Sequence, residues 1–241
     1  MKKNAARVRR TIVGAIDADV LAFTVGKDPE TDLLLVEADC AGTAAHVTML
    51  SRMPLKPPVF TATERKKVIA ELARIVRDAR RGAFRITIED QDVHMAVEKR
   101  LTKRLGDLGR KVHTARSRND QAAVDLRLFA RGQILDAAGE TLDLAGVLLA
   151  LARRHRLVPM VGRPHTQPAM ASSVGLWASA YAESLLDDAD LLMTVHEANN
   201  RCPLGSAASY GVPLPIDREL TSRLLGFSRP IIHQSGDLLI P

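Results

Sequence analysis

Aromatic residues are scarce in this sequence of 241 residues. Phe, Trp and Tyr together make up 3% of it, whereas hydrophobic residues as a whole make up 46%. A β-sandwich of this size would use more aromatic and β-branched side chains, so the composition favours helices rich in Ala and Leu. The scarcity also argues against single-stranded nucleic acid as a partner, because its bases stack on aromatic rings.

Cysteine is nearly absent as well. Cys40 and Cys202 are the two cysteines of the chain, and neither belongs to a Cys/His cluster with metal-binding spacing. A disulfide framework is therefore excluded. We expect two free thiols in a reducing compartment, and the sequence implies no metal and no organic cofactor.

Long apolar runs are missing too. A basic stretch over residues 1–10 leads into the apolar residues 11–16, which resemble the start of a signal peptide, but Asp17 and Asp19 end the run. An apolar helix needs about 20 residues to cross a bilayer. We therefore expect a cytoplasmic protein with no membrane partner.

Acidic residues are fewer than basic ones. The chain has 34 Lys and Arg against 28 Asp and Glu, which gives a formal net charge of +6. The basic residues are scattered and do not form the continuous stripe that is typical of nucleic-acid binding. A basic cleft would instead attract a small anionic substrate, because it raises the local concentration of the opposite charge.

Apolar residues recur at helical spacing through much of the chain. The pattern predicts helices over residues 39–50, 61–82 and 92–105. Thr61 and Glu64 have the spacing of a capping box, in which the hydroxyl and the carboxylate each accept a hydrogen bond from a free N–H of the first turn.

Two longer stretches contain no internal proline, residues 121–155 and residues 168–200, the second of which begins at Pro168. Each predicts a long helix, and the connection over residues 156–167 would join them into an antiparallel hairpin. Such a hairpin cannot bury apolar residues on both of its sides, so we expect a bundle shared between subunits.

Three glycines of the first long helix lie seven residues apart, at Gly132, Gly139 and Gly146. This repeat keeps them on nearly one face of the helix, where a neighbouring helix could approach closely. Each glycine costs an exposed helix about 1 kcal/mol relative to alanine. The alternative explanation is that the spacing arose by chance.

The most informative segment is residues 113–121, which read His-Thr-Ala-Arg-Ser-Arg-Asn-Asp-Gln. Two guanidiniums flank a hydroxyl, and an amide follows at once. A guanidinium pairs with a carboxylate through two parallel hydrogen bonds, so this segment suits a dicarboxylate substrate. A basic, solvated loop before a helix is the alternative.

The segment closely resembles the His-Thr-Gly-Arg-Ser-Arg-Asn-Asp-Gln segment of argininosuccinate lyases, and it differs only at Ala115. The resemblance implies that Arg118 and Asn119 hold the substrate carboxylates. The other residues that it places in the substrate-binding segment are Thr114, Arg116 and Ser117.

A second segment, residues 162–168, reads Gly-Arg-Pro-His-Thr-Gln-Pro and lies between the two long helices. It is similar to the Gly-x-Thr-His-x-Gln stretch of the fumarase/aspartase superfamily. The resemblance implies that His165 transfers protons, for which an imidazole is suited near neutral pH, and that Gln167 contacts the substrate. Pro164 stands where the family has a substrate-binding threonine.

Weaker matches supply three more candidate substrate-binding residues. Asp92 and His94 lie in a run similar to the Asp-Glu-Asp-Ile-His segment of argininosuccinate lyases, although acidic residues are common at any helix N-terminus. Thr24 lies in a stretch that resembles the family's N-terminal lobe. Residues 199–211 resemble the superfamily's Pro-Leu-Gly loop.

The reaction that the resemblance implies is a β-elimination that splits argininosuccinate into arginine and fumarate, a step of arginine biosynthesis. The family's proton-abstracting serine lies on a Gly-Ser-Ser-x-Met-Pro loop after the long helices. Residues 51–58 (Ser-Arg-Met-Pro-Leu-Lys-Pro-Pro) are a degenerate copy in the wrong place. We therefore expect a truncated chain with little activity alone.

Together these patterns predict an all-α chain. Residues 1–112 are expected to form a small helical N-terminal lobe, and residues 113–241 part of an elongated long-helix bundle of the fumarase/aspartase type. The resemblance further implies a carbon–nitrogen lyase that acts on a dicarboxylate and assembles as a homotetramer. The alternative is a non-catalytic, assembly-only subunit of a lyase-like oligomer.

Overall fold

The computed structural model describes residues 10–11, 14–207 and 211–231. Most of the basic stretch at the N-terminus and the last ten residues therefore lie outside the described residues. The chain divides into two compact units, the first made of Met1–Leu126 and Cys202–Pro241 and the second of Arg127–Arg201. Residues 113–126 and 202–241, which we expected in the bundle domain, are grouped with the N-terminal lobe in this division.

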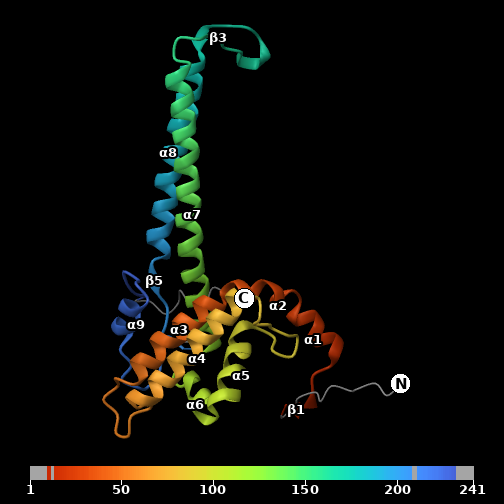
Figure 1. Ribbon diagram of the computed structural model, residues 1–241, viewed down its shortest axis with the longest axis vertical. Coiled ribbons are helices and arrows are strands. Elements are labelled where there is room, and N and C mark those ends of the chain that lie inside the picture. The colour runs from red at the N-terminus through yellow and green to blue at the C-terminus, as the bar shows by residue number, and fades with distance from the viewer. Residues whose placement is uncertain (1–9, 12–13, 208–210, 232–241) are drawn as a thin grey trace. The chain divides into compact units, whose positions relative to one another are not determined.

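Helices dominate the structure, which confirms the all-α prediction (Figure 1). The elements up to the start of the longest helix are β1 (Arg10–Thr11), β2 (Gly14–Ala15), α1 (Ala18–Val25), α2 (Asp28–Thr31), η1 (Asp32–Leu35), α3 (Val36–Leu50), α4 (Ala62–Arg80), α5 (Val93–Leu105), α6 (Asp107–Arg110) and η2 (Lys111–His113). The remaining elements are α7 (Arg118–Arg154), β3 (Pro159–Val161), η3 (Pro164–Thr166), β4 (Ala171–Ser173), α8 (Val174–Asn199), β5 (Arg201–Cys202), α9 (Arg218–Leu224) and β6 (Arg229–Pro230).

The core of the first unit forms where α3, α4 and α5 pack together. The fully buried side chains that fill it include Val36, Val47, Leu50, Phe60, Val68, Leu72, Val97 and Leu101. Helix α4 begins with the predicted capping box, because Thr61 and Glu64 exchange both expected hydrogen bonds.

Helix α3 is buried on most of its surface, unlike the one-sided helix α4. By its length and apolar composition, the stretch Asp28–Leu50 could cross a membrane. About half of its apolar window is buried inside the structure. A core helix passes the same test, and the burial of Val36, Val47 and Leu50 in the first unit identifies α3 as one.

The second unit is an antiparallel hairpin in which α8 runs back along α7 (Figure 1). Small residues line the seam, since the buried side chains of this unit are Ala138, Ala145, Ala152, Ala178, Ala182 and Ala189. At Gly175 the start of α8 packs tightly on the end of α7 and the residues after it, because a Cβ there would lie 3.1 Å from the Ala152 carbonyl oxygen and 2.6 Å from the Cα of Arg156. Alanine and glycine thus bring the two backbones together.

The expected helix over residues 168–200 starts later than the absence of proline suggested. Residues 171–173 form strand β4, which pairs antiparallel with β3. The Ser173 hydroxyl then accepts a hydrogen bond from the Leu176 N–H and caps α8. Proline spacing marks where a helix is permitted, but the capping serine decides where it begins.

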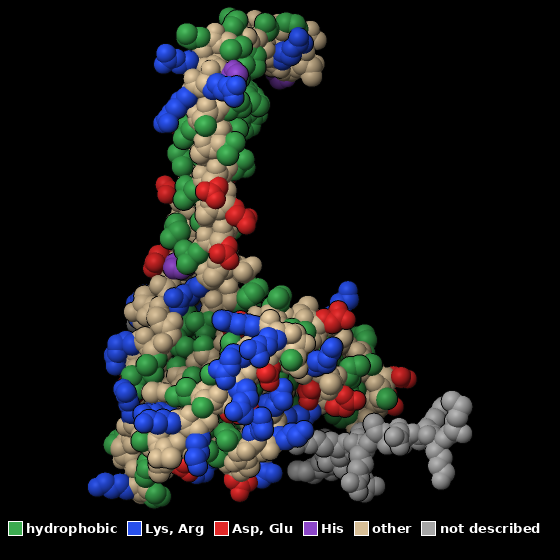
Figure 2. Space-filling model, in the orientation of Figure 1, with side chains coloured by type: hydrophobic (Ala, Val, Ile, Leu, Met, Phe, Trp, Pro, Cys, Tyr) green, Lys and Arg blue, Asp and Glu red, His purple; other side chains and the backbone are tan. Residues whose placement is uncertain are grey.

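The large apolar residues of the hairpin point away from the alanine seam. Figure 2 shows hydrophobic side chains along the visible surface of the second unit. The side chains that are at least half exposed include Leu142, Leu144, Val147, Leu176, Tyr181 and Leu191. A Cβ at Gly132, Gly139 or Gly146 would meet no atom within 4 Å among the described residues. The glycine row is therefore open and is not the face that meets α8.

Candidate functional site

Residues 113–121 form a tight turn that leads into the long helix α7. The Ser117 hydroxyl accepts a hydrogen bond from the Asn119 N–H (3.2 Å), and the Asp120 carboxylate accepts one from the Ser117 N–H (2.9 Å). This is a variant of the capping box, in which aspartate replaces the usual glutamate and the hydroxyl binds the N–H of the second helical residue instead of the third. It fixes the start of α7, so that Arg118 and Asn119 lie in its first turn.

Two side-chain hydrogen bonds join helix α3 to the turn. The Nε2 atom of His46 lies 2.8 Å from the Thr114 carbonyl oxygen, and the Arg116 guanidinium donates a hydrogen bond to the Thr43 hydroxyl at 2.9 Å. Burial, with the positive charge of Arg116 beside it, lowers the pKa of His46 to about 3. A neutral imidazole that donates from Nε2 to the carbonyl fits this environment.

A buried network of acids and a histidine continues below Arg116. The Asp39 carboxylate lies 2.8 Å from Nδ1 of His94 and accepts a hydrogen bond from the Gln121 amide. Burial alone would raise the pKa of Asp39, but the hydrogen bond from His94 and the charge of Arg116 outweigh it and lower the pKa. Burial and the negative charge of Asp39 raise the pKa of Asp125 well above its usual value.

Three residues of this network have the spacing of a metal site. The donor atoms of Asp39, His94 and Asp125 all lie within 4.8 Å of one another. However, the buried guanidinium of Arg116 already supplies positive charge to both carboxylates. A divalent cation would have to share the cluster with this guanidinium at unfavourable electrostatic cost, so the arrangement is better explained as an ionic network that supports the turn.

Arg118 and Asn119 are exposed, in contrast to the buried Arg116. The Arg118 guanidinium lies 3.1 Å from the Asp92 carboxylate, and its second terminal nitrogen lies 3.7 Å from Sδ of Met95. Asp92 also caps α5 by accepting from the Met95 N–H. Asp92 thus orients Arg118 on the surface while the guanidinium keeps a face open to solvent.

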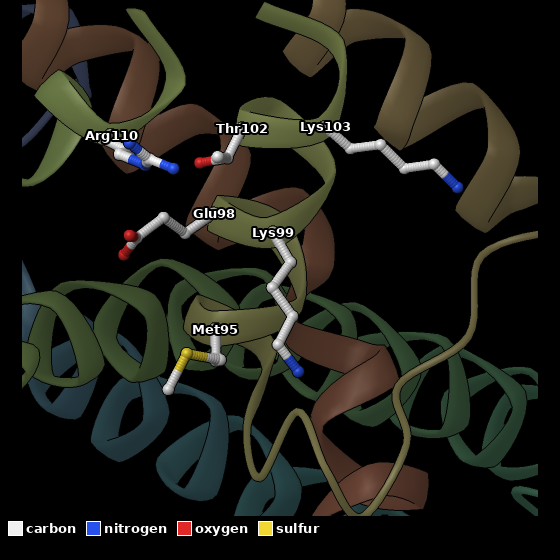
Figure 3. A pocket seen from close by; sticks show the side chains of 6 residues that line it. All are labelled: Met95, Glu98, Lys99, Thr102, Lys103 and Arg110. Carbon is white, nitrogen blue, oxygen red and sulfur yellow. The ribbon is translucent and has the colours of Figure 1, made fainter. Parts of the chain in front are cut away.

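A depression of about 500 Å³ adjoins this surface and is lined by Met95, Glu98, Lys99, Thr102, Lys103 and Arg110 (Figure 3). In Figure 3 the side chains of Glu98, Thr102 and Arg110 lie on one side, and the amines of Lys99 and Lys103 extend away on the other. Met95 belongs to the depression and also touches Arg118. Charged groups of both signs therefore line a depression that shares Met95 with the contacts of Arg118.

His165 and Gln167 lie in the second unit, at the tip of the loop between β3 and β4, and both are exposed. The Gly162 and Met170 backbones close the loop through a hydrogen bond of 2.8 Å. His165 and Thr166 both have positive φ angles, of 50° and 63°. Non-glycine residues in this region are strained by about 1–3 kcal/mol each, as is common at functional loops.

The remaining candidates are occupied within their own elements. The Thr24 hydroxyl donates to the Val20 and Leu21 carbonyls of α1. Ser51, in the degenerate copy of the serine loop, ends α3, where its hydroxyl donates to the Thr48 carbonyl and accepts from Arg65. Both hydroxyls are committed to local hydrogen bonds.

The structure thus brings one group of candidates together and sorts it into two layers. Arg118 and Asn119 form the exposed layer, with the partly buried Asp92 beside Arg118, and Arg116 and His94 belong to the buried layer. The sequence analysis missed the partners of the buried layer, which are Asp39, Thr43, His46, Asp120, Gln121 and Asp125. A signal was present, because Asp39, Thr43 and His46 of the mostly apolar α3 are four and three residues apart and share one helix face.

Ala115, the one departure from the family segment, has a φ angle of 60°. An L-residue loses about 1–2 kcal/mol there, and glycine avoids most of this cost. We expect Ala115→Gly to raise the free energy of unfolding by about 0.5–1 kcal/mol, measured by urea unfolding. Ala70→Gly on the exposed face of α4 should lower it by about 1 kcal/mol. A loss in both variants would contradict the strain at Ala115.

A family model described as a lyase matches residues 32–232. The chain belongs to this lyase family. It is 47% identical over 212 residues to the argininosuccinate lyase of Phocaeicola vulgatus. This match covers 88% of this chain and 47% of the relative. It is 38% identical over 225 residues to the argininosuccinate lyase of Thermotoga neapolitana, with 92% of this chain and 56% of the relative covered. The resemblance of the chain to argininosuccinate lyases is confirmed.

Solved structures of the lyase fold agree. EDDS lyase in complex with formate matches 95% of this chain and 44% of its own with a TM-score of 0.73 and 25% identity. The fumarate lyase:delta crystallin from Brucella melitensis matches 93% of this chain and 56% of its own, with a TM-score of 0.64 and 17% identity, which bears on the fold alone. The chain spans about half the length of the curated relatives it matches.

Proposed function

We propose that this chain supplies the carboxylate-binding part of an argininosuccinate lyase, which splits argininosuccinate into arginine and fumarate. The observation that carries the proposal is the exposed pair Arg118 and Asn119 in the first turn of α7, held by a buried layer of hydrogen bonds. A guanidinium, an amide and the positive end of a long helix dipole act together on an anion at this point.

In the reaction, a base removes a proton from the carbon next to a substrate carboxylate, and the bond from the adjacent carbon to nitrogen breaks. The electron pair of the broken C–H bond is first delocalised into the carboxylate, which gives a doubly charged aci-carboxylate. The same pair then forms the double bond of fumarate as the carbon–nitrogen bond breaks. Arg118 and Asn119 would stabilise this charge. His165 would take part in proton transfer, and the leaving nitrogen of arginine must gain a proton.

Arg118→Lys tests the proposal, because lysine keeps the charge but cannot form two parallel hydrogen bonds with a carboxylate. We expect fumarate affinity to fall by about 1–3 kcal/mol in a calorimetric titration. Arg104→Lys is a matched control, since Arg104 is similarly exposed and also pairs with one carboxylate, that of Glu71. Equal losses in the two variants would indicate a merely basic surface.

The second candidate function is assembly without catalysis, and the exposed apolar faces of the hairpin favour it. Leu135 and Leu142 are about half exposed, and each lies three residues after one of the open glycines, Gly132 and Gly139. An exposed apolar surface of this kind marks an interaction site. Both candidate functions place this surface in a homo-oligomer, which would be a cytoplasmic tetramer by analogy with the family.

We therefore expect the isolated chain to self-associate at micromolar concentration, measured by analytical ultracentrifugation. Leu135→Glu combined with Leu142→Glu should shift the distribution toward monomer, because charges on this face would have to be desolvated in a contact. A control pair on the polar surface of α4, Lys66→Glu with Lys67→Glu, should leave association unchanged. A monomer in the wild type would contradict the prediction.

A further inference from the structure

Asp120 belongs to the 113–121 segment, and its side chain reaches a second loop far away in the sequence. It is fully buried. One carboxylate oxygen accepts from the Ser117 N–H at 2.9 Å and completes the capping box. The other oxygen accepts two more hydrogen bonds, from the Gly205 N–H at 3.1 Å and the Ala207 N–H at 3.0 Å. Capping of α7 therefore uses only half of this carboxylate.

The loop over residues 203–207 is shaped to present these two amides. Gly205 has a φ angle of 100° and Ala207 one of 56°. A Cβ at Gly205 would lie 2.8 Å from Cγ of Arg218, so the turn requires glycine. Its N–H groups face Asp120, and the conformation is maintained although Ala207 is in a region that alanine disfavours.

Arg218 holds the same loop through its carbonyl groups. The Arg218 guanidinium donates to the Leu204 oxygen at 3.0 Å and to the Pro203 oxygen at 3.4 Å. A buried carboxylate thus binds the N–H groups of the loop and a guanidinium binds its carbonyls. Charge-assisted hydrogen bonds of this kind are stronger than neutral ones, so the position of the loop depends on Asp120.

We propose that Asp120 is a positioning residue that couples the carboxylate-binding segment 113–121 to the loop 203–207. The proposal rests on the function proposed above. A dicarboxylate held by Arg118 and Asn119 orders the first turn of α7, and Asp120, one residue further on, transmits this order to the loop. Because coupling is reciprocal, the loop in turn strengthens dicarboxylate binding.

Asp120→Asn tests the coupling with little change in shape. The amide oxygen can still accept from the Ser117 N–H, but the amide nitrogen then faces two N–H donors. We expect hydrogen exchange at the Gly205 and Ala207 amides to accelerate at least about tenfold, and fumarate affinity to fall about tenfold. Hydrogen exchange at the Leu72 amide in the core should change only as much as the variant changes the global free energy of unfolding.

Asp17→Asn is the matched control, because Asp17 caps α1 by accepting from two backbone amides, those of Asp19 and Val20. It should change neither fumarate affinity nor exchange at Gly205 and Ala207. Unchanged exchange at those two amides in Asp120→Asn overturns the proposal. So does faster exchange with unaltered fumarate affinity, since Asp120 would then be purely structural.

The wild-type chain gives a test that does not depend on the folding of the variant. Saturating fumarate should slow exchange at Gly205 and Ala207 severalfold, and fumarate that binds without this effect overturns the proposal. If the wild type binds no fumarate, the proposed function fails. The response of the two amides to Asp120→Asn then decides by itself whether Asp120 couples the segment to the loop.

Discussion

Arg116→Met should lower the free energy of unfolding by about 3–5 kcal/mol, the cost of removing one partner from a buried ionic network. Arg116 is 8% exposed, and Asp39 beside it is fully buried. Methionine fills a similar volume but leaves Asp39 without the positive charge that helps to lower its pKa. Urea unfolding followed by circular dichroism measures the change.

The pH dependence of stability provides a second measurement on the same variant. A carboxylate with a lowered pKa stabilises the folded state above its ordinary value of 3.8, and this contribution is lost as the pH falls through the folded-state pKa. Without Arg116 the pKa of Asp39 rises, so the contribution of Asp39 above its ordinary pKa should shrink.

Arg80→Met is the control, because Arg80 and its partner Glu37 are both exposed. Exposed ion pairs contribute at most about 1 kcal/mol. Adding Asp39→Asn to Arg116→Met should recover part of the loss, since the two residues belong to one network and their effects are not additive. A loss below about 1 kcal/mol in Arg116→Met would contradict a structural role for Arg116 and would favour direct substrate contact.

The second large effect concerns His165. We expect the isolated chain to release almost no fumarate from argininosuccinate. We expect turnover when a relative's C-terminal segment that carries the serine loop is supplied. In that mixture His165→Asn should reduce turnover by at least about 10²-fold, because a positioned proton-transfer group contributes about 10²–10⁴-fold and asparagine cannot exchange a proton near neutral pH.

His155→Asn is the matched control for His165, since His155 lies in the same unit, just after the end of α7. It should leave turnover unchanged. Turnover that survives His165→Asn would remove the role of this histidine. Strong turnover by the isolated chain that disappears in Ser51→Ala would make residues 51–58 the catalytic loop, against their local hydrogen bonds.

The helices could be predicted from the sequence because their signals are local. The capping box at Thr61 and the apolar spacing of α4 correctly located that helix, and the absence of proline located α7. The start of α8 could not be predicted in this way, since it depends on the pairing of β4 with β3 and on the Ser173 cap. Pairing of strands is a tertiary event that helical periodicity does not contain.

The candidate site was predictable in its exposed layer and not in its buried one. Arg118 and Asn119 follow from the motif alone. The same motif places Arg116 beside them, yet the structure buries this guanidinium against α3. Its partners Thr43 and Asp39 lie about 75 residues earlier in the sequence. Contacts over such separations depend on helix packing, which a motif does not specify.

The most direct measurement of the central claim is the location of fumarate on the wild-type chain, from amide chemical shifts during a titration. The claim predicts the largest shifts at residues 114–119, smaller ones at Asp92 and Met95, and loss of all of them in Arg118→Lys. Shifts that gather instead around Lys99, Lys103 and Arg110, or the absence of any saturable shift, would contradict carboxylate binding by the first turn of α7.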